Sequence, residues 1–179
     1  WGSAIAKILL NGNVICSTTS TSTIETFTVS IGDEILICEE YSVLNLYTIT
    51  FDTSTSASIS GWDVSNVTNM FEMFYDTAIF NQPLNNWNVS SVTTMGGMFY
   101  NAASFNQPLN NWDVSSVKDM SRMFRSAPEF DFPLNSWDVS SVTNMTYMFN
   151  TTKFNQDIGD WNVSSVKNMN NMFHLNSKF

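Results

Sequence analysis

The sequence predicts an α+β protein, in which a small antiparallel β domain precedes an α/β solenoid of about five 25-residue units. Tryptophan recurs along the second part of the chain at intervals of 25, 25, 25 and 24 residues, and all ten methionines fall in the phrases that these tryptophans open. Residues 1–58 lack this repeat. The predicted domains are therefore a β-rich domain at 1–58 and a repeat solenoid at 59–179. The repeating tryptophans are Trp62, Trp87, Trp112, Trp137 and Trp161.

The first 58 residues contain β-branched and aromatic stretches that are separated by turn residues. Asn11-Gly12-Asn13 and Gly32-Asp33 supply the turn chemistry. An antiparallel arrangement of short strands is expected from this pattern. The predicted strands cover residues 4–10, 24–30, 34–40 and 43–52.

Each repeat unit is expected to contain one strand and one short helix. Val117, Met120, Met123 and Phe124 follow the spacing of one helical face. Before them, the alternation of Trp112 and Val114 predicts a brief strand that pairs with its equivalents in a parallel ladder. The strands would then line one face of the solenoid and the helices the other.

The tryptophans and the Met-Phe pairs, such as Met123 and Phe124, are expected to form the core. The alternative interpretation of the Met-Phe pairs is a flexible, methionine-rich binding groove. Amide side chains also recur in register, and a structural role is expected for them, in hydrogen bonds from unit to unit. They are Asn81, Asn106, Asn155, Gln82, Gln107, Gln156, Asn85, Asn110 and Asn135.

The composition favours an exported protein without a nucleic-acid or membrane partner. Only 13% of the residues are charged, and the net charge of −9 disfavours binding to nucleic acid or to an anionic membrane. No apolar run approaches the roughly 20 residues that span a bilayer, so no membrane insertion is expected. The chain begins with Trp1, which indicates a mature, processed polypeptide.

Cys16 and Cys38 are the two cysteines, and both lie outside the repeats. A structural disulfide between them is expected if the protein is exported, and two buried free thiols are the alternative. Residues 17–23 contain only Ser and Thr, so O-linked sugar is one hypothesis there, against an unmodified loop or an edge strand. The candidate acceptors are Thr18, Thr19, Thr21 and Thr23.

Five sequons are candidates for N-glycosylation, although such motifs also arise by chance in a chain rich in Asn, Ser and Thr. Asn150 is expected to be the best acceptor because it lies in the predicted loop after the helix. Asn88 and Asn162 lie next to a strand tryptophan and are expected to be shielded. The remaining sequons are at Asn66 and Asn144.

No catalytic centre, metal site or cofactor is predicted. His174 is the single histidine and has no orienting partner in the sequence pattern, which makes it a poor general base. Asp63, Asp113 and Asp138 share one repeat position, so a calcium-binding row is conceivable. Asn88 and Asn162 replace them in two units, and this favours Asx turns or caps over calcium.

The repeat resembles that of BspA-like leucine-rich-repeat surface proteins. The resemblance rests on the phrase from Phe105 through Trp112-Asp113-Val114-Ser115 to Met123-Phe124, and it covers about residues 59–179. It implies a leucine-rich-repeat-like solenoid in a secreted or surface-anchored protein of bacteria or microbial eukaryotes, connected with adhesion and with host or matrix contact. The family motif includes no catalytic residues.

The leading functional hypothesis is a non-enzymatic structural or adhesive protein, extracellular or at the cell surface, that assembles head-to-tail with other copies of itself into a filament. The assembly edge would be Met172, Phe173 and Phe179, where no polar capping segment follows. The alternative is a monomeric recognition module that binds a host or matrix protein or a glycan. In that case the binding residues would be on the sheet face or at the positions that vary between repeats, which are Phe71, Gly96, Ser121, Thr146 and Asn170.

Overall fold

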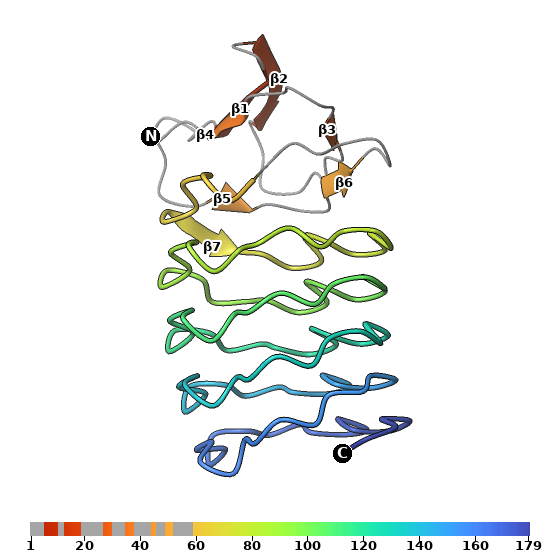
Figure 1. Cartoon of the computed structure of the whole chain (residues 1–179). Coiled ribbons are helices and arrows are strands. Elements are labelled where there is room, and N and C mark those ends of the chain that lie inside the picture. The colour runs from red at the N-terminus through yellow and green to blue at the C-terminus, as the bar shows by residue number, and fades with distance from the viewer. Residues whose placement is uncertain are drawn as a thin grey trace.

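The repeats form a stack of coils, one coil for each unit, in which equivalent residues of successive units lie beside one another (Figure 1). This computed structural model describes residues 59–179 without a gap, together with residues 6–10, 13–18, 27–29, 35–37, 44–45 and 49–51. The chain runs in the same direction in every coil. Coil 1 begins at Trp62, and coils 2 to 5 begin at the four tryptophans that follow.

Alternate backbone N–H groups join each coil to the next one. In coil 1, Met70 and Glu72 donate to the carbonyl oxygens of Thr94 and Gly96 at 3.0 and 2.8 Å. The same pattern recurs between each later pair of coils, so the buried backbone groups of the stack find partners in a neighbouring coil. One residue of each coil forms a parallel bridge, and these bridges link Asn69 to Thr94, Thr94 to Asp119, Asp119 to Asn144, and Asn144 to Asn168.

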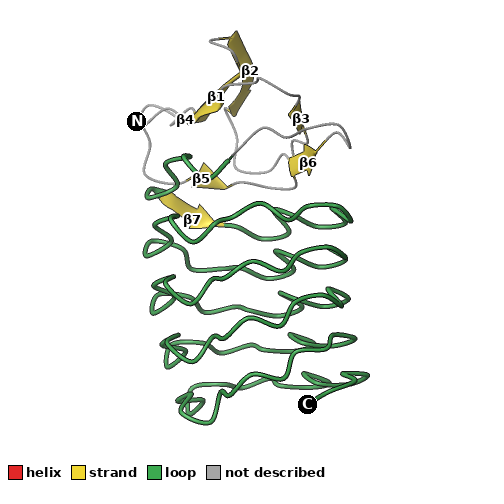
Figure 2. Ribbon diagram, viewed as in Figure 1, coloured by secondary structure: helices red, strands yellow, loops and turns green. Residues whose placement is uncertain are grey.

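Residues 59–179 contain no helix, so the predicted helices and the α+β class are wrong (Figure 2). Met120, Met123 and Phe124 have helical spacing, but Arg122 and Ser126 adopt φ angles of 57° and 55°. A right-handed helix cannot continue through such residues. Met123 therefore closes a single turn on the carbonyl of Met120 at 3.2 Å, and the neighbouring coil receives the other bonds. Equivalent positions carry positive φ in every coil, at residues 72, 76, 97, 101, 147, 151, 171 and 175.

The predicted strand at Trp112 and Val114 is also absent, because both residues lie in irregular backbone. Parallel pairing occurs instead five to seven residues further along each unit, at the bridge residues such as Asp119. In coil 1 this segment is long enough to form strand β7 (Val67–Asn69). The ladder is therefore parallel, but it lies at a different repeat position from the one predicted.

The strands before residue 59 do not form a purely antiparallel domain, so that part of the predicted fold is wrong as well. β1 (Ala6–Leu10) pairs antiparallel with β2 (Asn13–Thr18) and with β4 (Ile35–Ile37). In contrast, β3 (Phe27–Val29) pairs parallel with β6 (Ile49–Phe51). β5 (Leu44–Asn45) pairs parallel with β7 and so extends the ladder of the coils by one step (Figure 1). The division of the chain at residue 58 stays a prediction.

The core is a set of side-chain columns that run along the stack. Phe99 stacks on Phe74 and on Phe124 with ring centroids 5.5 and 5.6 Å apart, and Met123 and Phe124 are fully buried. The predicted core role of these two residues and of the last four tryptophans is confirmed, and a methionine-rich groove is excluded in coils 1 to 4. Of the tryptophans, Trp62 is half-buried, whereas the others are at most 8% exposed; these are Trp87, Trp112, Trp137 and Trp161.

Candidate binding surfaces of the coil stack

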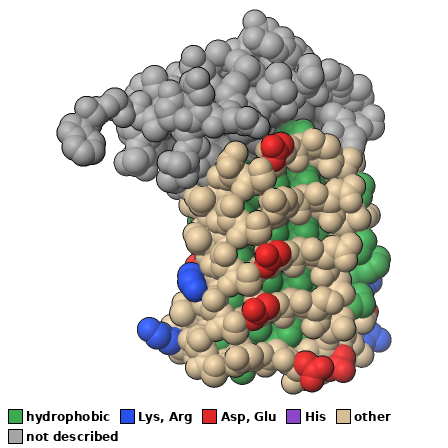
Figure 3. Space-filling view, turned by 90° about the vertical axis from the view of Figure 1, so that its left-hand side faces the viewer, with side chains coloured by type: hydrophobic (Ala, Val, Ile, Leu, Met, Phe, Trp, Pro, Cys, Tyr) green, Lys and Arg blue, Asp and Glu red, His purple; other side chains and the backbone are tan. Residues whose placement is uncertain are grey.

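One edge of the stack carries an Asx column, which we define as Asp63, Asn88, Asp113, Asp138 and Asn162. Each Oδ1 atom accepts a hydrogen bond from the backbone N–H of the serine two residues further on, at 3.0 to 3.2 Å. The predicted Asx turns are therefore confirmed. Acidic side chains lie one above another along this face (Figure 3). Within the described residues, no group of three or more His, Cys, Asp and Glu side chains is arranged to hold a metal ion.

Two carboxylates of the Asx column are stabilised in their charged form. The pKa of Asp63 lies below its usual value, chiefly because the side chain of Ser65 donates to the carboxylate and secondly because the backbone N–H of Ser65 does. Asp138 has a lowered pKa for the same two reasons, with Ser140 as the donor. Asp63 and Asp138 therefore stay negatively charged at neutral pH.

The opposite edge carries an amide ladder. The backbone N–H of Asn106 donates to Oδ1 of Asn81 at 2.9 Å, and that of Asp131 donates to Oδ1 of Asn106 at 3.2 Å. Oδ1 of Asp131 accepts in turn from the N–H of Asn155 at 2.9 Å, and Gln107 Nε2 donates to Asn81 Oδ1 at 3.0 Å. The predicted role in hydrogen bonds from unit to unit is confirmed for five of the amides, which are Asn81, Asn106, Gln107, Asn110 and Gln156. It stays a prediction for the side chains of Gln82, Asn85, Asn135 and Asn155.

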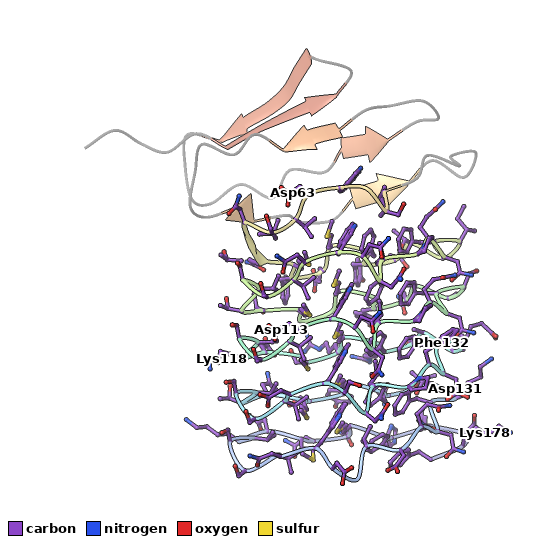
Figure 4. The ribbon with its side chains drawn as sticks, turned by 60° about the vertical axis from the view of Figure 1, so that its left-hand side comes forward. Asp63, Asp113, Lys118, Asp131, Phe132 and Lys178 are labelled. Carbon is purple, nitrogen blue, oxygen red and sulfur yellow. The ribbon has the colours of Figure 1, made fainter. Side chains whose placement is uncertain are left out.

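The two edges are far apart. Figure 4 shows Asp113 and Lys118 at one edge of the stack and Asp131 and Phe132 at the other. Phe132 occupies the repeat position of the ladder glutamines, and it is partly buried against the core.

The variable position named by the sequence analysis is not an open surface in all coils. Gly96 is buried, and a Cβ atom at this residue would lie 3.0 Å from Cδ2 of Phe71. Phe71 thus covers the space above Gly96. Ser121 and Thr146 are half-buried, and Asn170 is exposed.

A second variable position, which directly follows the Met-Phe pair, contributes three of four interacting side chains that were not predicted from the sequence. The fourth, Tyr147, lies three residues before that position in coil 4. Arg125 lies over the ring of Tyr100, with Cζ 5.1 Å from the ring centroid, and over the ring of Tyr147 at 4.9 Å. Tyr75 meets Tyr100 edge-on at 5.1 Å. We call these four half-buried residues the Tyr-Arg row. The available sequence signal was the set of side chains at this position, which are Tyr75, Tyr100, Arg125, Asn150 and His174.

Asn150 is buried rather than exposed in a loop. Its side chain is 5% exposed, and Nδ2 donates to the carbonyl oxygen of His174 at 2.8 Å. The same nitrogen lies 3.2 Å from Nδ1 of His174, whose side chain is exposed. An N-linked sugar would have to be attached to this nitrogen. Asn150 was preferred as the acceptor because it was expected to lie in an accessible loop, and the folded chain does not place it in one.

The other sequons are more accessible. Asn66, Asn88 and Asn162 are exposed, and Asn144 is half-buried. Asn88 and Asn162 are therefore not shielded by the neighbouring tryptophans. Glycosylation at any of these residues stays a prediction.

The three residues of the expected assembly edge have different environments. Met172 is buried at 5% exposure, so it belongs to the interior of coil 5. Phe173 is half-buried and stacks on Phe149 and on Phe179 with centroids 5.6 and 3.9 Å apart. Phe179 is 57% exposed.

Several other candidates are outside the residues or side chains that the structure describes. Cys38, Thr19, Thr21 and Thr23 are outside the described residues, and so is the expected disulfide. Thr18 is the last residue of β2, and Cys16 lies opposite Ile8 in the pairing of β1 with β2. The side chains of those strands are not described.

The fold defines a class of repeat protein in which helix-free coils stack through parallel backbone bonds and aromatic columns. A family model described as "Mycoplasma protein of unknown function, DUF285" matches residues 45–153 and again residues 108–179. The chain belongs to this family. The first match begins at Asn45, which is also the residue that pairs with Asn69 at the start of the coil ladder. Neither a curated protein nor a solved structure matches the chain.

The described part of the chain has no helix that is long and apolar enough to cross a membrane.

Proposed function

We propose that the chain is a non-enzymatic structural and adhesive repeat protein that acts outside the cell or at its surface. The coil stack would serve as a rigid support that holds surface columns in register for contact with a protein or a glycan. Two features support this proposal: the resemblance of the repeat to BspA-like surface proteins and the low charged fraction of 13%. A solenoid with a regular core offers an extended surface of this kind.

The observation that carries the proposal is the contrast between core and surface. The residues at the Phe column are the same in every coil, and the rings of Phe99, Phe124 and Phe149 stack at 5.6 Å. The position next to this column differs in every coil but the first two, which both carry tyrosine, and its side chain is half-buried or exposed in every coil except coil 4, where Asn150 is buried. Because stacking does not dictate which residue stands there, the half-buried and exposed side chains can serve recognition.

Binding of the purified, labelled chain to an array of matrix proteins and glycans tests the proposal. We expect saturable binding to a small subset of the array. A thermally unfolded sample is the control for nonspecific adsorption. Absence of saturable binding to every member would contradict an adhesive role, and measurable hydrolysis of any member would contradict a non-enzymatic role.

Assembly of copies end to end is a second form of the same structural role. It is favoured by the uniformity of the contacts between coils, since each coil offers the next one the same set of donors and acceptors. A coil of another copy would therefore fit the stack in the same way. Sedimentation velocity at several concentrations, followed by electron microscopy, tests this form. Particles that lengthen with concentration support it, and a single monomer boundary at all concentrations excludes it.

A further inference from the structure

An imidazole and an amide face each other across the boundary between coils 4 and 5. Asn150 Nδ2 lies 3.2 Å from Nδ1 of His174, and the same nitrogen donates to the backbone carbonyl oxygen of His174 at 2.8 Å. The side chain of Asn150 is buried, whereas that of His174 is exposed. His174 is the single histidine of the chain, and the proposed function does not use its titration.

The amide of Asn150 has a fixed orientation. Its Oδ1 atom accepts from the hydroxyl of Thr151 at 3.1 Å, while its Nδ2 atom donates to the carbonyl of His174. Turning the amide by half a rotation would place Oδ1 against that carbonyl oxygen, so that two acceptors would face each other. Asn150 therefore presents a donor, and not an acceptor, to the imidazole.

A donor at this place suits the neutral imidazole and opposes the protonated one. In the neutral ring that carries its proton on Nε2, Nδ1 is an acceptor and can receive the Asn150 N–H. In the protonated ring both nitrogens are donors, so two N–H groups would face each other at 3.2 Å. Histidines change charge between about pH 8 and pH 5. Acidification therefore removes this contact, and the exposed ring has to turn away from coil 4.

The groups around His174 supply no anion that would hold the protonated ring in place. The side chains at the neighbouring variable and left-handed positions of coils 4 and 5 are Thr146, Tyr147, Thr151, Asn170, Asn171 and Leu175, of which only the phenol of Tyr147 titrates. Arg125 of coil 3 lies over the Tyr147 ring, with Cζ 4.9 Å from the centroid. The charged residues nearest in sequence to Asn150 and His174 are the cations Lys153 and Lys178.

Ion pairing does not change this picture. Lys153 pairs with Glu129 at 2.6 Å, and in residues 59–179 no carboxylate lies within ion-pair distance of His174. A proton on the imidazole thus adds positive charge beside an N–H donor without a compensating partner.

We propose that protonation of His174 weakens the contact between coils 4 and 5, which makes this boundary a pH-sensitive joint of the stack. The effect is local, because each coil contacts only its neighbours. Other bonds across the boundary involve no titrating group, such as that from the N–H of Phe149 to the carbonyl of Met172 at 2.9 Å. Acidification therefore loosens the joint and does not separate the coils. This inference goes beyond the adhesive role and does not depend on it.

Amide hydrogen exchange of the full chain, followed by NMR at pH 5.5 and pH 7.5, tests the joint. The N–H of Thr151 reports on it, because this group donates to the carbonyl of His174 at 3.0 Å. After correction for the intrinsic exchange rate at each pH, its protection should fall about three- to tenfold at pH 5.5, as expected for the loss of one neutral hydrogen bond.

The stack supplies an internal control for the measurement. The N–H of Asn101 occupies the same repeat position and donates to the carbonyl of Arg125 at 3.0 Å, between two coils that contain no histidine. Its protection should change less than about twofold, well below the effect of a lost hydrogen bond. Asp63 and Asp138 stay charged at pH 5.5, because hydrogen bonds lower their pKa values, so the Asx column does not contribute to the difference.

Two variants test the cause. His174→Gln takes up no proton, and the protection of Thr151 should then be equal at the two pH values. Since the side chain of His174 is exposed, this variant should fold as the wild type does. Asn150→Asp places a carboxylate against the ring and should reverse the sign, with higher protection at pH 5.5, because the protonated imidazole then donates to a charged acceptor. Circular dichroism melting curves show whether each variant is folded, and His174→Gln decides the question by itself if Asn150→Asp is not.

Three results would overturn the joint. One is equal protection of Thr151 at both pH values in the wild type. Another is a fall at pH 5.5 that persists unchanged in His174→Gln. The third is an equal fall at Asn101, which would mean that acid loosens the whole stack. Failure of the chain to bind any member of the array would leave the joint intact, because hydrogen exchange is measured without a ligand.

Discussion

Trp112 donates a hydrogen bond from its indole Nε1 atom to the backbone carbonyl oxygen of Leu84, 28 residues earlier in the chain, at 2.9 Å. The carbonyl is buried, and so is the ring. Trp87, Trp137 and Trp161 make the equivalent bond at 2.9 to 3.1 Å. Each tryptophan therefore contributes apolar area to the core and also donates a second hydrogen bond to a buried carbonyl, which already accepts from a backbone N–H, as Leu84 does from Trp87 at 3.0 Å.

Trp112→Phe should lower the free energy of unfolding by about 1 to 3 kcal/mol, because it removes the indole hydrogen bond to the carbonyl of Leu84 and opens a cavity. Urea denaturation measures this loss. Trp62→Phe is the control, since Trp62 is half-buried and a smaller loss is expected there. A loss of less than about 0.5 kcal/mol in Trp112→Phe would mean that the indole hydrogen bond is not important for the stack.

Backbone conformation at the first left-handed position of each coil gives a second prediction. Gly97 has a φ of 63°, and a Cβ atom there would lie 2.8 Å from Cγ of Glu72. Gly97→Ala should therefore destabilise the chain by about 1 to 2 kcal/mol. At the equivalent Arg122, with a φ of 57°, the Gly variant should be more stable than the Ala variant by about 1 kcal/mol, because glycine adopts positive φ without strain.

Thermal or urea unfolding of Gly97→Ala, Arg122→Gly and Arg122→Ala checks this prediction. The comparison of Gly with Ala at residue 122 cancels the loss of the arginine side chain. If Ala were as stable as Gly at residue 122, the left-handed turn would not be the native conformation of this segment.

The amide ladder gives a third prediction. Its control is an aspartate at the ladder position, which the chain already has at Asp131. Asn81 Oδ1 accepts from the N–H of Asn106 and from Nε2 of Gln107, and Asp131 Oδ1 accepts from the N–H of Asn155 in the same way. Asn81→Ala removes the acceptor and should cost about 1 kcal/mol of stability. Asn81→Asp keeps the acceptor and should cost much less. Equal losses in the two variants, measured by urea denaturation, would argue against the ladder as a link between coils.

The period of the tryptophans predicts the stacking and the core, because residues that repeat at a fixed interval make the same buried contacts in every coil. It does not predict the backbone path. Met120, Met123 and Phe124 have a spacing that fits a helix equally well, and Arg122 gives no indication of its positive φ, since glycine occurs at this position only in coil 2. The left-handed turns follow from hydrogen bonds to the neighbouring coil, which a single unit does not reveal.

The Tyr-Arg row was missed for a related reason. Arg125 and Tyr100 share a repeat position, but Tyr147 occupies the position three residues before it in the next coil. A comparison of equivalent positions therefore cannot find the contact between Arg125 and Tyr147. The amide ladder, in contrast, joins residues at equivalent positions, and the register of the asparagines was enough to predict it.

The Asx column predicts part of the response of stability to pH. Hydrogen bonds from Ser65 and Ser140 lower the pKa values of Asp63 and Asp138 in the folded chain. A lowered folded pKa stabilises the protein above the unfolded pKa of about 3.9, and that contribution disappears as the pH falls through the folded pKa. Asp63→Asn with Asp138→Asn should therefore reduce the loss of stability between pH 7 and pH 3. The Asx turns should survive, because Asn88 and Asn162 form them in the wild-type chain.

Urea denaturation of the wild type and of this double variant at pH 7 and pH 3 measures the difference. Ser65→Ala with Ser140→Ala is the complementary test, since it removes the hydroxyl donors and keeps the carboxylates. It should also reduce the loss of stability on acidification, because the folded pKa values would return toward the unfolded one. If both double variants lost as much stability as the wild type between the two pH values, the serine hydroxyls would not lower the pKa values of Asp63 and Asp138 in solution.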